Sequence, residues 1–398
     1  MGKRQTHELR NRVLFAALVL FIYLLCWYVP LYGVTTKATT DAVGGQYFLT
    51  MLVGGGRDRQ SMMTLGVAPY INASLLVQVA FAFRSSASRA KVSKVRSDRW
   101  MLRVALAFAF IMALMRSFGL SLDPNAGPAG VVRLVVTVEM FAGALLTTVL
   151  CMLNERHGAG ASMPVILVNV VVPLARGMGD NRFLDFPDVG LVCAAAIAAT
   201  VLMENSLIRL PLQRVSIHNV HADQNYLAYK RAPMGIMPVM FASSAFLLPY
   251  FLVNMLASLY PENAALAAAR DELVLTRPLG AAVYLALIVV LSLLFSFLML
   301  NPRETAHQLQ RNGDSIVGMY AGRQTARFLT ALVAKWSFLS ALLQAACMAV
   351  SLALSLSGAI PAALAMTPAS TMILASIVCS LVQELKSYYR YDAYRFFM

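Results

Sequence analysis

The side chains that most often catalyse reactions or bind metals are few in this sequence and are not grouped. His218 and His221, three residues apart, could share a metal ion, but no further His, Cys or acidic cluster accompanies them. The chain has no His-Glu-x-x-His motif of a metalloprotease, and nothing points to a serine dyad. The five cysteines lie in apolar runs without the paired spacing of a metal site or a disulfide framework. We therefore predict no metal site, no cofactor and no enzyme activity.

A glycine-rich stretch, GGGRDRQS at residues 54–61, is the other place where chemistry could reside. A phosphate-binding loop ends in Lys-Ser or Lys-Thr, and this stretch does not. We interpret the glycines as a hinge. Because the chain carries no phosphate-loop motif, any energy for work must come from a partner.

The clearest internal pattern is a repeated set of Gly, Pro, Ala and Ser in two apolar stretches. The second set lies 169 positions after the first, at the same spacing: Gly66, Pro69, Ala73 and Ser74, then Gly235, Pro238, Ala242 and Ser243. A membrane-length segment that contains a proline and polar side chains must bury that face in protein or line a cavity with it. Two such segments, residues 61–83 and 236–259, predict a duplicated fold around a central path.

Composition sets the protein class. Hydrophobic residues make up 59% of the chain, charged residues 13%, and the mean hydropathy is +0.66, which excludes an ordinary soluble domain. We predict an all-α polytopic membrane protein, since a helix of about 20 apolar residues crosses a bilayer. About ten apolar runs qualify, the first being a retained helix and not a cleaved signal: 13–32, 61–83, 100–120, 131–153, 163–174, 189–208, 236–259, 279–300, 336–356 and 367–382.

The net charge of +14 is sorted along the chain. If the N-terminus is cytoplasmic, Lys and Arg outnumber Asp and Glu in the cytoplasmic segments, and the outer loops hold more acidic than basic residues. This is the positive-inside pattern. It predicts a multi-pass protein of the cell membrane with both termini in the cytoplasm, and it explains the charge by the lipid bilayer and not by nucleic acid.

Several segments resemble the SecY/Sec61 family of protein-conducting channels. TLGVAPYINASLLVQ is similar to the family's second helix, NERHGAGAS to the turn before its fifth, and GIMPVMFASSAFLLP to its seventh. NPRETAHQLQRNGDSIVGMYAGRQTARFL resembles the loop between helices eight and nine. The loop RVSIHNVHADQNYLAYK resembles that of the accessory SecY of Gram-positive bacteria, which works with a dedicated SecA motor.

The resemblance implies two inverted five-helix halves, residues 1–185 and 186–398, that open laterally between the second and seventh helices. It also implies a re-entrant plug at about residues 40–60. Residues 47–53 are apolar but too short to span a bilayer, which suits a segment packed inside a cavity; the alternative is a surface loop. The plug residues expected on this basis are Tyr47, Phe48, Leu49, Gly54 and Gly55.

The resemblance further implies an apolar constriction. A ring of aliphatic side chains seals against ions by dewetting and lets an extended polypeptide pass. The ring residues expected here are Ile71, Leu75, Val165, Met240, and Ile373 or Leu374. Asn169 departs from the family pattern, because it stands where the fifth helix would offer another apolar ring residue.

The gate and the docking surfaces follow from the same resemblance. Polar contacts across the lateral gate are expected from Gln78, Ser243 and Ser244. Two cytoplasmic loops, residues 210–234 and 301–327, would dock the motor, with Arg303, Arg311, Tyr320 and Arg323 as contact residues. Where the family has an Ile-Arg-Pro-Gly turn, this chain has Met-Tyr-Ala-Gly at residues 319–322, and a changed docking loop fits a changed motor.

These features favour a passive channel for unfolded secretory polypeptides, driven by a SecA-like ATPase, in the accessory pathway for specialised cell-surface proteins. A SecE-like small membrane subunit and further accessory Sec proteins are possible partners. The alternative is an inverted-repeat secondary transporter of a small solute, which the repeat alone supports equally. A transporter needs charged or ion-coordinating groups near the midplane, and the sequence offers mainly Asn72, Asn169 and hydroxyls there.

Overall fold

The computed structural model describes most of the chain. Outside the described residues lie 1–7, 35–60, 83–93, 119, 121, 181, 215–225, 260–267, 270–271, 276, 362–363 and 395–398. The predicted plug, with Tyr47, Phe48, Leu49, Gly54 and Gly55, falls wholly in one of these gaps.

Ten helices of at least 15 residues form the body of the described chain, in the order and number that the sequence predicts. They are α1 (Glu8–Trp27), α3 (Ala68–Ala82), α5 (Lys94–Phe118), α6 (Ala129–His157), α7 (Met163–Asp180), α8 (Pro187–Asn205), α9 (Met237–Leu259), α11 (Pro278–Leu300), α13 (Arg323–Leu356) and α14 (Thr367–Tyr394). Seven of the described helices are long and apolar enough to cross a membrane by themselves, and α3 and α7 are shorter apolar helices. This confirms the polytopic helical membrane protein.

Several helices are longer than the apolar runs that revealed them. Helix α7 continues through Pro173 to Asp180, six residues beyond the predicted span. Helix α13 begins at Arg323, and α14 continues to Tyr394. Hydropathy reports only the part of a helix that lies in lipid, so polar extensions at helix ends escape it.

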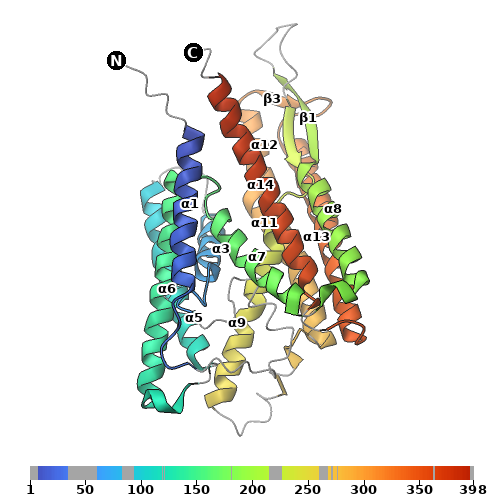
Figure 1. Ribbon diagram of the computed structural model, residues 1–398. Coiled ribbons are helices and arrows are strands. Elements are labelled where there is room, and N and C mark those ends of the chain that lie inside the picture. The colour runs from blue at the N-terminus through green and yellow to red at the C-terminus, as the bar shows by residue number, and fades with distance from the viewer. Residues whose placement is uncertain are drawn as a thin grey trace, which may run out of the picture.

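A small sheet interrupts the helical architecture at the end of the molecule where α1 begins and α14 ends (Figure 1). Strand β1 (Leu207–Arg214) is central and pairs antiparallel with β2 (Tyr226–Lys230) and with β3 (Asp314–Ile316). A short helix, α12 (Pro302–Arg311), precedes β3. The two segments predicted as separate cytoplasmic loops are therefore joined through one three-stranded sheet.

The helices form two groups joined by α7 (Figure 1). Helices α1, α3, α5 and α6 pack against one another, as do α8, α11, α13 and α14. Helix α7 runs between the groups and packs against α14 and α1, while α9 contacts α3, α5, α11 and α14. The 3-10 helix η2 (Phe183–Asp185) joins α7 to α8 at the predicted boundary between the halves, and η1 (Pro124–Ala126) precedes α6.

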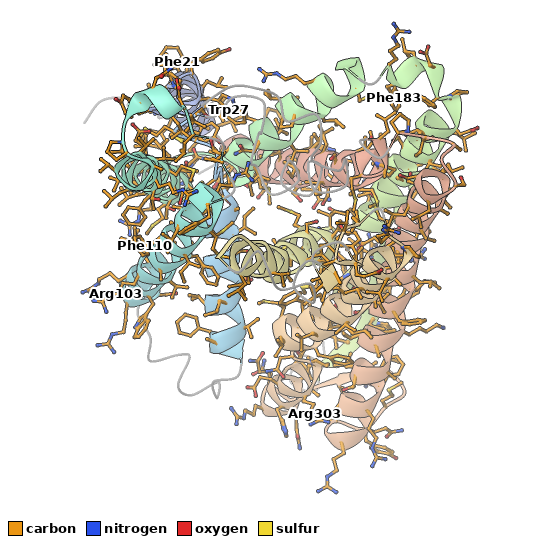
Figure 2. The ribbon with its side chains drawn as sticks, turned by 90° about the horizontal axis from the view of Figure 1, so that it is seen from below. Phe21, Trp27, Arg103, Phe110, Phe183 and Arg303 are labelled. Carbon is orange, nitrogen blue, oxygen red and sulfur yellow. The ribbon has the colours of Figure 1, made fainter. Side chains whose placement is uncertain are left out.

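The outer surface of the bundle is apolar where lipid would cover it. Phe21 and Phe110 are 60% and 53% exposed and lie on the outside of their helices (Figure 2). Arg103 and Arg303 project outward as well (Figure 2). The buried core runs through all ten long helices and includes Tyr23, Tyr284 and Met140 as its largest fully buried side chains.

The repeated Gly-Pro-Ala-Ser pattern has a repeated local structure. Gly66 and Gly235 adopt φ of +52° and +56°, in the left-handed region where glycine carries no Cβ penalty. The Gly66 N–H donates to Met63 O at 2.9 Å, and the Gly235 N–H donates to Ala232 O at 3.2 Å. Each turn leads into a helix, α3 or α9, that begins two residues later with proline in its second position. The predicted 169-residue offset therefore holds for the turns, their hydrogen bonds and the helix starts.

Candidate functional site

A cavity of about 380 Å³ lies between the helices that follow the two repeated turns and their neighbours α7 and α14. Each of these four helices contributes aliphatic or thioether side chains to its lining, and α11 contributes Phe295 and Met299. The four that we follow are Ile71 of α3, Ile166 of α7, Met240 of α9 and Ile377 of α14. Tyr70, Gln78, Glu204 and Lys230 add polar groups to the lining. The repeat aligns Ile71 with Met240, 169 positions apart, so equivalent positions of the two repeated helices meet at one space.

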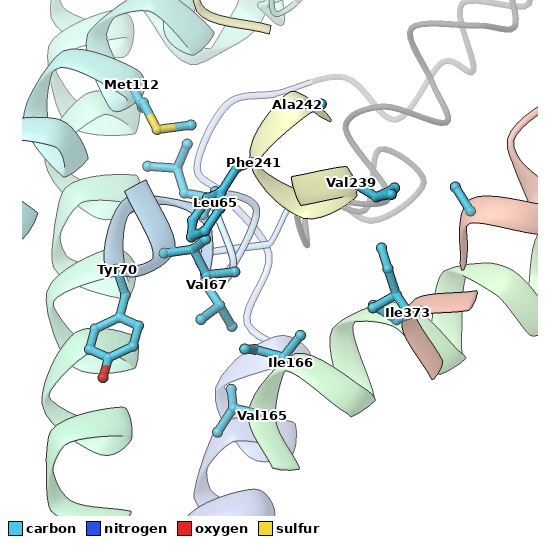
Figure 3. Close-up of a cluster of buried hydrophobic side chains, with 14 of the residues drawn as sticks. Leu65, Val67, Tyr70, Met112, Val165, Ile166, Val239, Phe241, Ala242 and Ile373 are labelled. Atoms are coloured by element: carbon cyan, nitrogen blue, oxygen red, sulfur yellow. The ribbon is translucent and has the colours of Figure 1, made fainter. Parts of the chain in front are cut away.

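The expected ring residues lie in two different settings. Ile71 and Met240 line the cavity. Val165 and Ile373 are fully buried in the core, and Leu374 is half-buried against it. The backbone of Leu75 belongs to α3, one turn beyond Ile71. In Figure 3, Ile373 points toward Val239 of α9, whereas Ile166 and Val165 lie on different sides of α7.

Asn169, the departure from the family pattern, does not line the cavity. Its side-chain oxygen accepts a hydrogen bond from the Tyr23 hydroxyl at 2.6 Å, and its amide donates to Val165 O at 3.0 Å. Tyr23 in turn meets Trp27 edge-on within α1. Asn169 therefore fixes α7 to α1, and α7 lines the cavity with Met163 and Ile166 instead. Neighbouring residues of a helix are rotated by about 100°, so a shift of one position changes which side chain faces the space.

The expected gate residues also differ in their surroundings. Gln78 is exposed and lines the cavity. Ser243 is fully buried, donates to Val239 O at 2.9 Å, and lies 3.1 Å from the Tyr284 hydroxyl of α11. The structure thus places Ser243 on the α11 side of α9, and it describes the backbone of Ser244 in α9 without its side chain.

The sheet, α12 and the first turns of α13 form a compact unit that we call the platform. Its core is a separate hydrophobic cluster of Leu210, Tyr229, Ala306, Leu309, Ile316, Leu329 and Val333. Helix α12 turns Ala306 and Leu309 toward the sheet and leaves Arg303 and Arg311 exposed. Tyr320 is 86% exposed in the turn after β3, and Arg323 is exposed at the start of α13. All four expected docking residues therefore lie on the surface of one unit.

Tyr229 of β2 shows how tightly the platform packs. Burial raises the pKa of its phenol above the usual value, and a hydrogen bond with Thr305 of α12 opposes that rise. The sheet and α12 thus share a buried polar contact as well as an apolar core.

Comparison with known proteins identifies the architecture. A family model described as SecY matches residues 61–382, which is most of the chain. This chain belongs to the SecY family. Among solved structures, one described as the structure of a protein conducting channel is similar with a TM-score of 0.69 at 13% sequence identity, over 98% of this chain and 95% of that chain. At that identity the likeness shows the fold.

Sequence relatives point toward the accessory branch of the family. The accessory Sec system protein translocase subunit SecY2 of Streptococcus pneumoniae serotype 4 is 28% identical over 341 residues, which cover 83% of each chain. A protein translocase subunit SecY of Streptococcus gordonii is 26% identical over 369 residues, covering 84% of this chain and 83% of the relative. This agrees with the family resemblance that the sequence segments indicate.

Glu204 of α8 is the site residue that sequence reasoning passed over. It lines the cavity, is only 4% exposed, and accepts a short hydrogen bond from the Ser376 hydroxyl of α14. A carboxylate inside a membrane protein is a functional candidate by default, which is the signal that could have found it. Its neighbours Ser376 and Gly235 are far away in the sequence and carry no such signal.

Proposed function

We propose that this chain is the channel-forming subunit of a Sec-type translocase, which conducts unfolded secretory polypeptides across the cytoplasmic membrane. The observation that carries the proposal is the cavity where Ile71, Ile166, Met240 and Ile377 converge from four helices, two of which begin with the repeated turn. Membership of the SecY family supports the same conclusion.

The proposed constriction is aliphatic. Ile71, Leu75, Val165, Met240, Ile373 and Leu374 are its proposed residues, and the cavity lining adds Ile166 and Ile377. Flexible apolar side chains can exclude water and ions when no chain is present. They also give a passing polypeptide few groups to bind, so that it can leave.

The proposed lateral gate lies between α3 and α9, which pack directly against each other. Gln78 lines the cavity on the α3 side, and Ser243 and Ser244 belong to α9. The proposed plug, residues 40–60, directly precedes the buried turn that leads into α3. Opening would separate helices from the two predicted halves, residues 1–185 and 186–398.

The proposed partner at the platform is a SecA-like ATPase of the accessory pathway. The end of the molecule that carries the sheet, the start of α1 and the end of α14 would then face the cytoplasm (Figure 1). Arg303, Arg311, Tyr320 and Arg323 present cationic and aromatic groups there, as residues that anchor protein interfaces often do. A SecE-like subunit and accessory Sec proteins complete the proposed assembly, and specialised cell-surface proteins are the proposed cargo.

A solute transporter is the competing function, and one observation favours it. Glu204 and Lys230 both line the cavity, so the space contains the charged groups that ion coupling requires. Family membership outweighs this observation. The two functions differ in what crosses the membrane, which can be measured.

The deciding experiment is transport into vesicles that contain the purified full-length chain, with or without a SecA-like motor and ATP. We expect a secretory protein to become protected from protease only when the chain, motor and ATP are all present. Ile71→Asn and Met240→Asn should raise ion leak and admit cargo with a defective signal. Phe110→Asn, on the outer surface, is the control. Protection that does not depend on the chain, with folded protein and bound motor, would overturn the proposal.

A further inference from the structure

Glu204, Ser376 and Gln344 surround the backbone of Gly235, two residues before α9 begins. The Glu204 carboxylate lies so close to Gly235 that an added Cβ would stand 2.6 Å from its Oε1 atom. The Ser376 hydroxyl donates to the same carboxylate. On another side, the Gln344 side-chain amide donates to the Gly235 carbonyl at 2.8 Å. We call these four residues the clamp.

The clamp joins three helices to a fourth. Glu204 comes from α8, Gln344 from α13 and Ser376 from α14, and these helices pack against one another. Gly235 belongs to the turn that leads into α9. Side chains of these three helices therefore surround the turn that begins α9, which packs against α3 across the proposed gate.

The clamp requires a glycine at position 235 and consists of buried polar side chains. Gly235 has φ of +56°, and its missing side chain is what allows the carboxylate to approach. Glu204, Gln344 and Ser376 are all nearly inaccessible to solvent, and polar contacts in such surroundings are strong when paired and costly when lost. A buried carboxylate that packed only against apolar groups would destabilise the fold, because no hydrogen bond would offset the loss of its hydration.

We infer that the clamp positions the start of α9 and thereby sets how readily the α3–α9 interface opens, with Glu204, Gln344 and Ser376 as positioning residues. The inference rests on the proposed function for its meaning in transport. The position of α9 can nevertheless be measured without cargo or motor.

The clamp predicts a specific coupling between two substitutions. Gly235→Ala places a methyl group against the carboxylate and should push α9 from its place. Glu204→Ala removes the carboxylate and should free the same turn. In the double variant the added methyl group no longer meets Oε1, so the combined effect should be smaller than the sum of the two.

The test is the distance between spin labels at Gln78→Cys of α3 and Met237→Cys of α9, which both line the cavity. The full-length chain is reconstituted alone, with its partly exposed cysteines replaced: Cys26, Cys347 and Cys379. We expect one dominant distance in the parent chain. Glu204→Ala should raise the ratio of displaced to parental distances by roughly tenfold, the effect of losing one buried hydrogen bond. Gly235→Ala should raise the same ratio, because its methyl group would stand 2.6 Å from Oε1 of Glu204.

Gly358→Ala is the matched control, because Gly358 also has positive φ, +76°, but open space around its Cβ position. It carries the backbone strain without the clamp and should leave the distances unchanged. The isosteric Glu204→Gln replaces Glu204→Ala if the latter does not fold, with a smaller shift in the same direction. Parental distances in folded Glu204→Gln and Gly235→Ala, or an equal shift in Gly358→Ala, would overturn the inference. Failure of cargo transport would count against the proposed function only. The clamp would still be tested by the distances between the spin labels.

Discussion

The two repeated turns share a backbone geometry but are held by different chemistry. The α3 lead-in, residues 61–67, is held by backbone contacts to the segment that follows α1. The Met62 N–H donates to Val29 O at 3.0 Å, and Ser61 forms an isolated β-bridge with Pro30. Helix α6 approaches this lead-in closely at Gly143, where an added Cβ would lie 2.0 Å from Met62 O. The α9 lead-in, residues 231–236, also has one backbone bond to its neighbour, from the Arg231 N–H to Ser206 O at 3.0 Å. Around Gly235, however, the contacts come from side chains of α8, α13 and α14.

From this difference we expect α3 to be the fixed helix of the proposed gate and α9 the adjustable one. Backbone pairing and close packing have no intermediate state, so the α3 lead-in is expected to stay in place or unfold. A side-chain clamp can release one contact at a time. The comparison therefore predicts that substitutions beside α3 reduce stability, whereas substitutions beside α9 shift the gate.

Gly143→Ala should have the largest effect on stability. Its methyl group would overlap a backbone oxygen that cannot rotate away, at a cost of about 3 kcal/mol of unfolding free energy. Thermal unfolding of the purified protein measures this cost. Gly130→Ala in the same helix has open space and is the control. Equal melting temperatures for the two variants would contradict the packing account.

Gln344→Leu should be next, and it should act on the gate. It keeps the volume of the side chain but leaves the Gly235 carbonyl without its donor, at a cost of about 1–3 kcal/mol. The distance between labels on α3 and α9 should shift along with the melting temperature. Thr330→Val, whose hydroxyl bonds only within α13, should shift neither. A melting change without a distance change would place Gln344 among purely structural residues.

Arg231→Ala should loosen the α9 lead-in more gently. Its guanidinium lies 5.1 Å from the Trp336 ring centroid of α13, a contact worth about 0.5–1 kcal/mol at an exposed site. Arg209→Ala is closely matched, since Arg209 lies at the same 5.1 Å from Tyr226 but within the sheet. We expect similar stability losses, with a gate shift only for Arg231→Ala. A gate shift in both variants would show that the platform as a whole moves α9.

Thr147→Val, beside the α3 lead-in, should have the smallest effect. The Thr147 hydroxyl donates to Gly143 O at 2.9 Å and lies 3.3 Å from the sulfur of Met63. Sulfur is a weak acceptor, so the loss should stay below about 1 kcal/mol and the gate distance should not change. A distance shift as large as that of Gln344→Leu would contradict the expectation that only substitutions beside the α9 lead-in move the gate.

The fold can be predicted from the sequence where it depends on single segments of the chain. Ten apolar runs predict ten helices, and the spacing of Gly66 and Gly235 predicts two equivalent turns, because membrane length and glycine geometry are local properties. The sheet escapes prediction because β1 and β3 are separated by about a hundred residues, and three residues of β3 carry no pattern of their own.

The sequence predicts which helices line the cavity better than it predicts which of their side chains do. Ile71 and Met240 are found at the cavity, since the repeat fixes their register. Helix α7 begins MPVILVNVVV, in which Asn169 is the one polar residue, so the apolar periodicity cannot choose between Val165 and Ile166. Glu204 was visible as a membrane carboxylate, but its contact with Gly235 exists only in the folded chain.

The central claim is that a polypeptide passes through the cavity between α3 and α9. Its most direct test is site-specific crosslinking of a stalled secretory chain to single cysteines at Ile71, Ile166 and Met240, with the motor bound. The account predicts crosslinks at all three positions and none at the lipid-facing controls Phe21 and Phe110. Absence of crosslinks at the cavity positions, with the protein folded and the motor bound, would contradict it and favour the transport of a small solute.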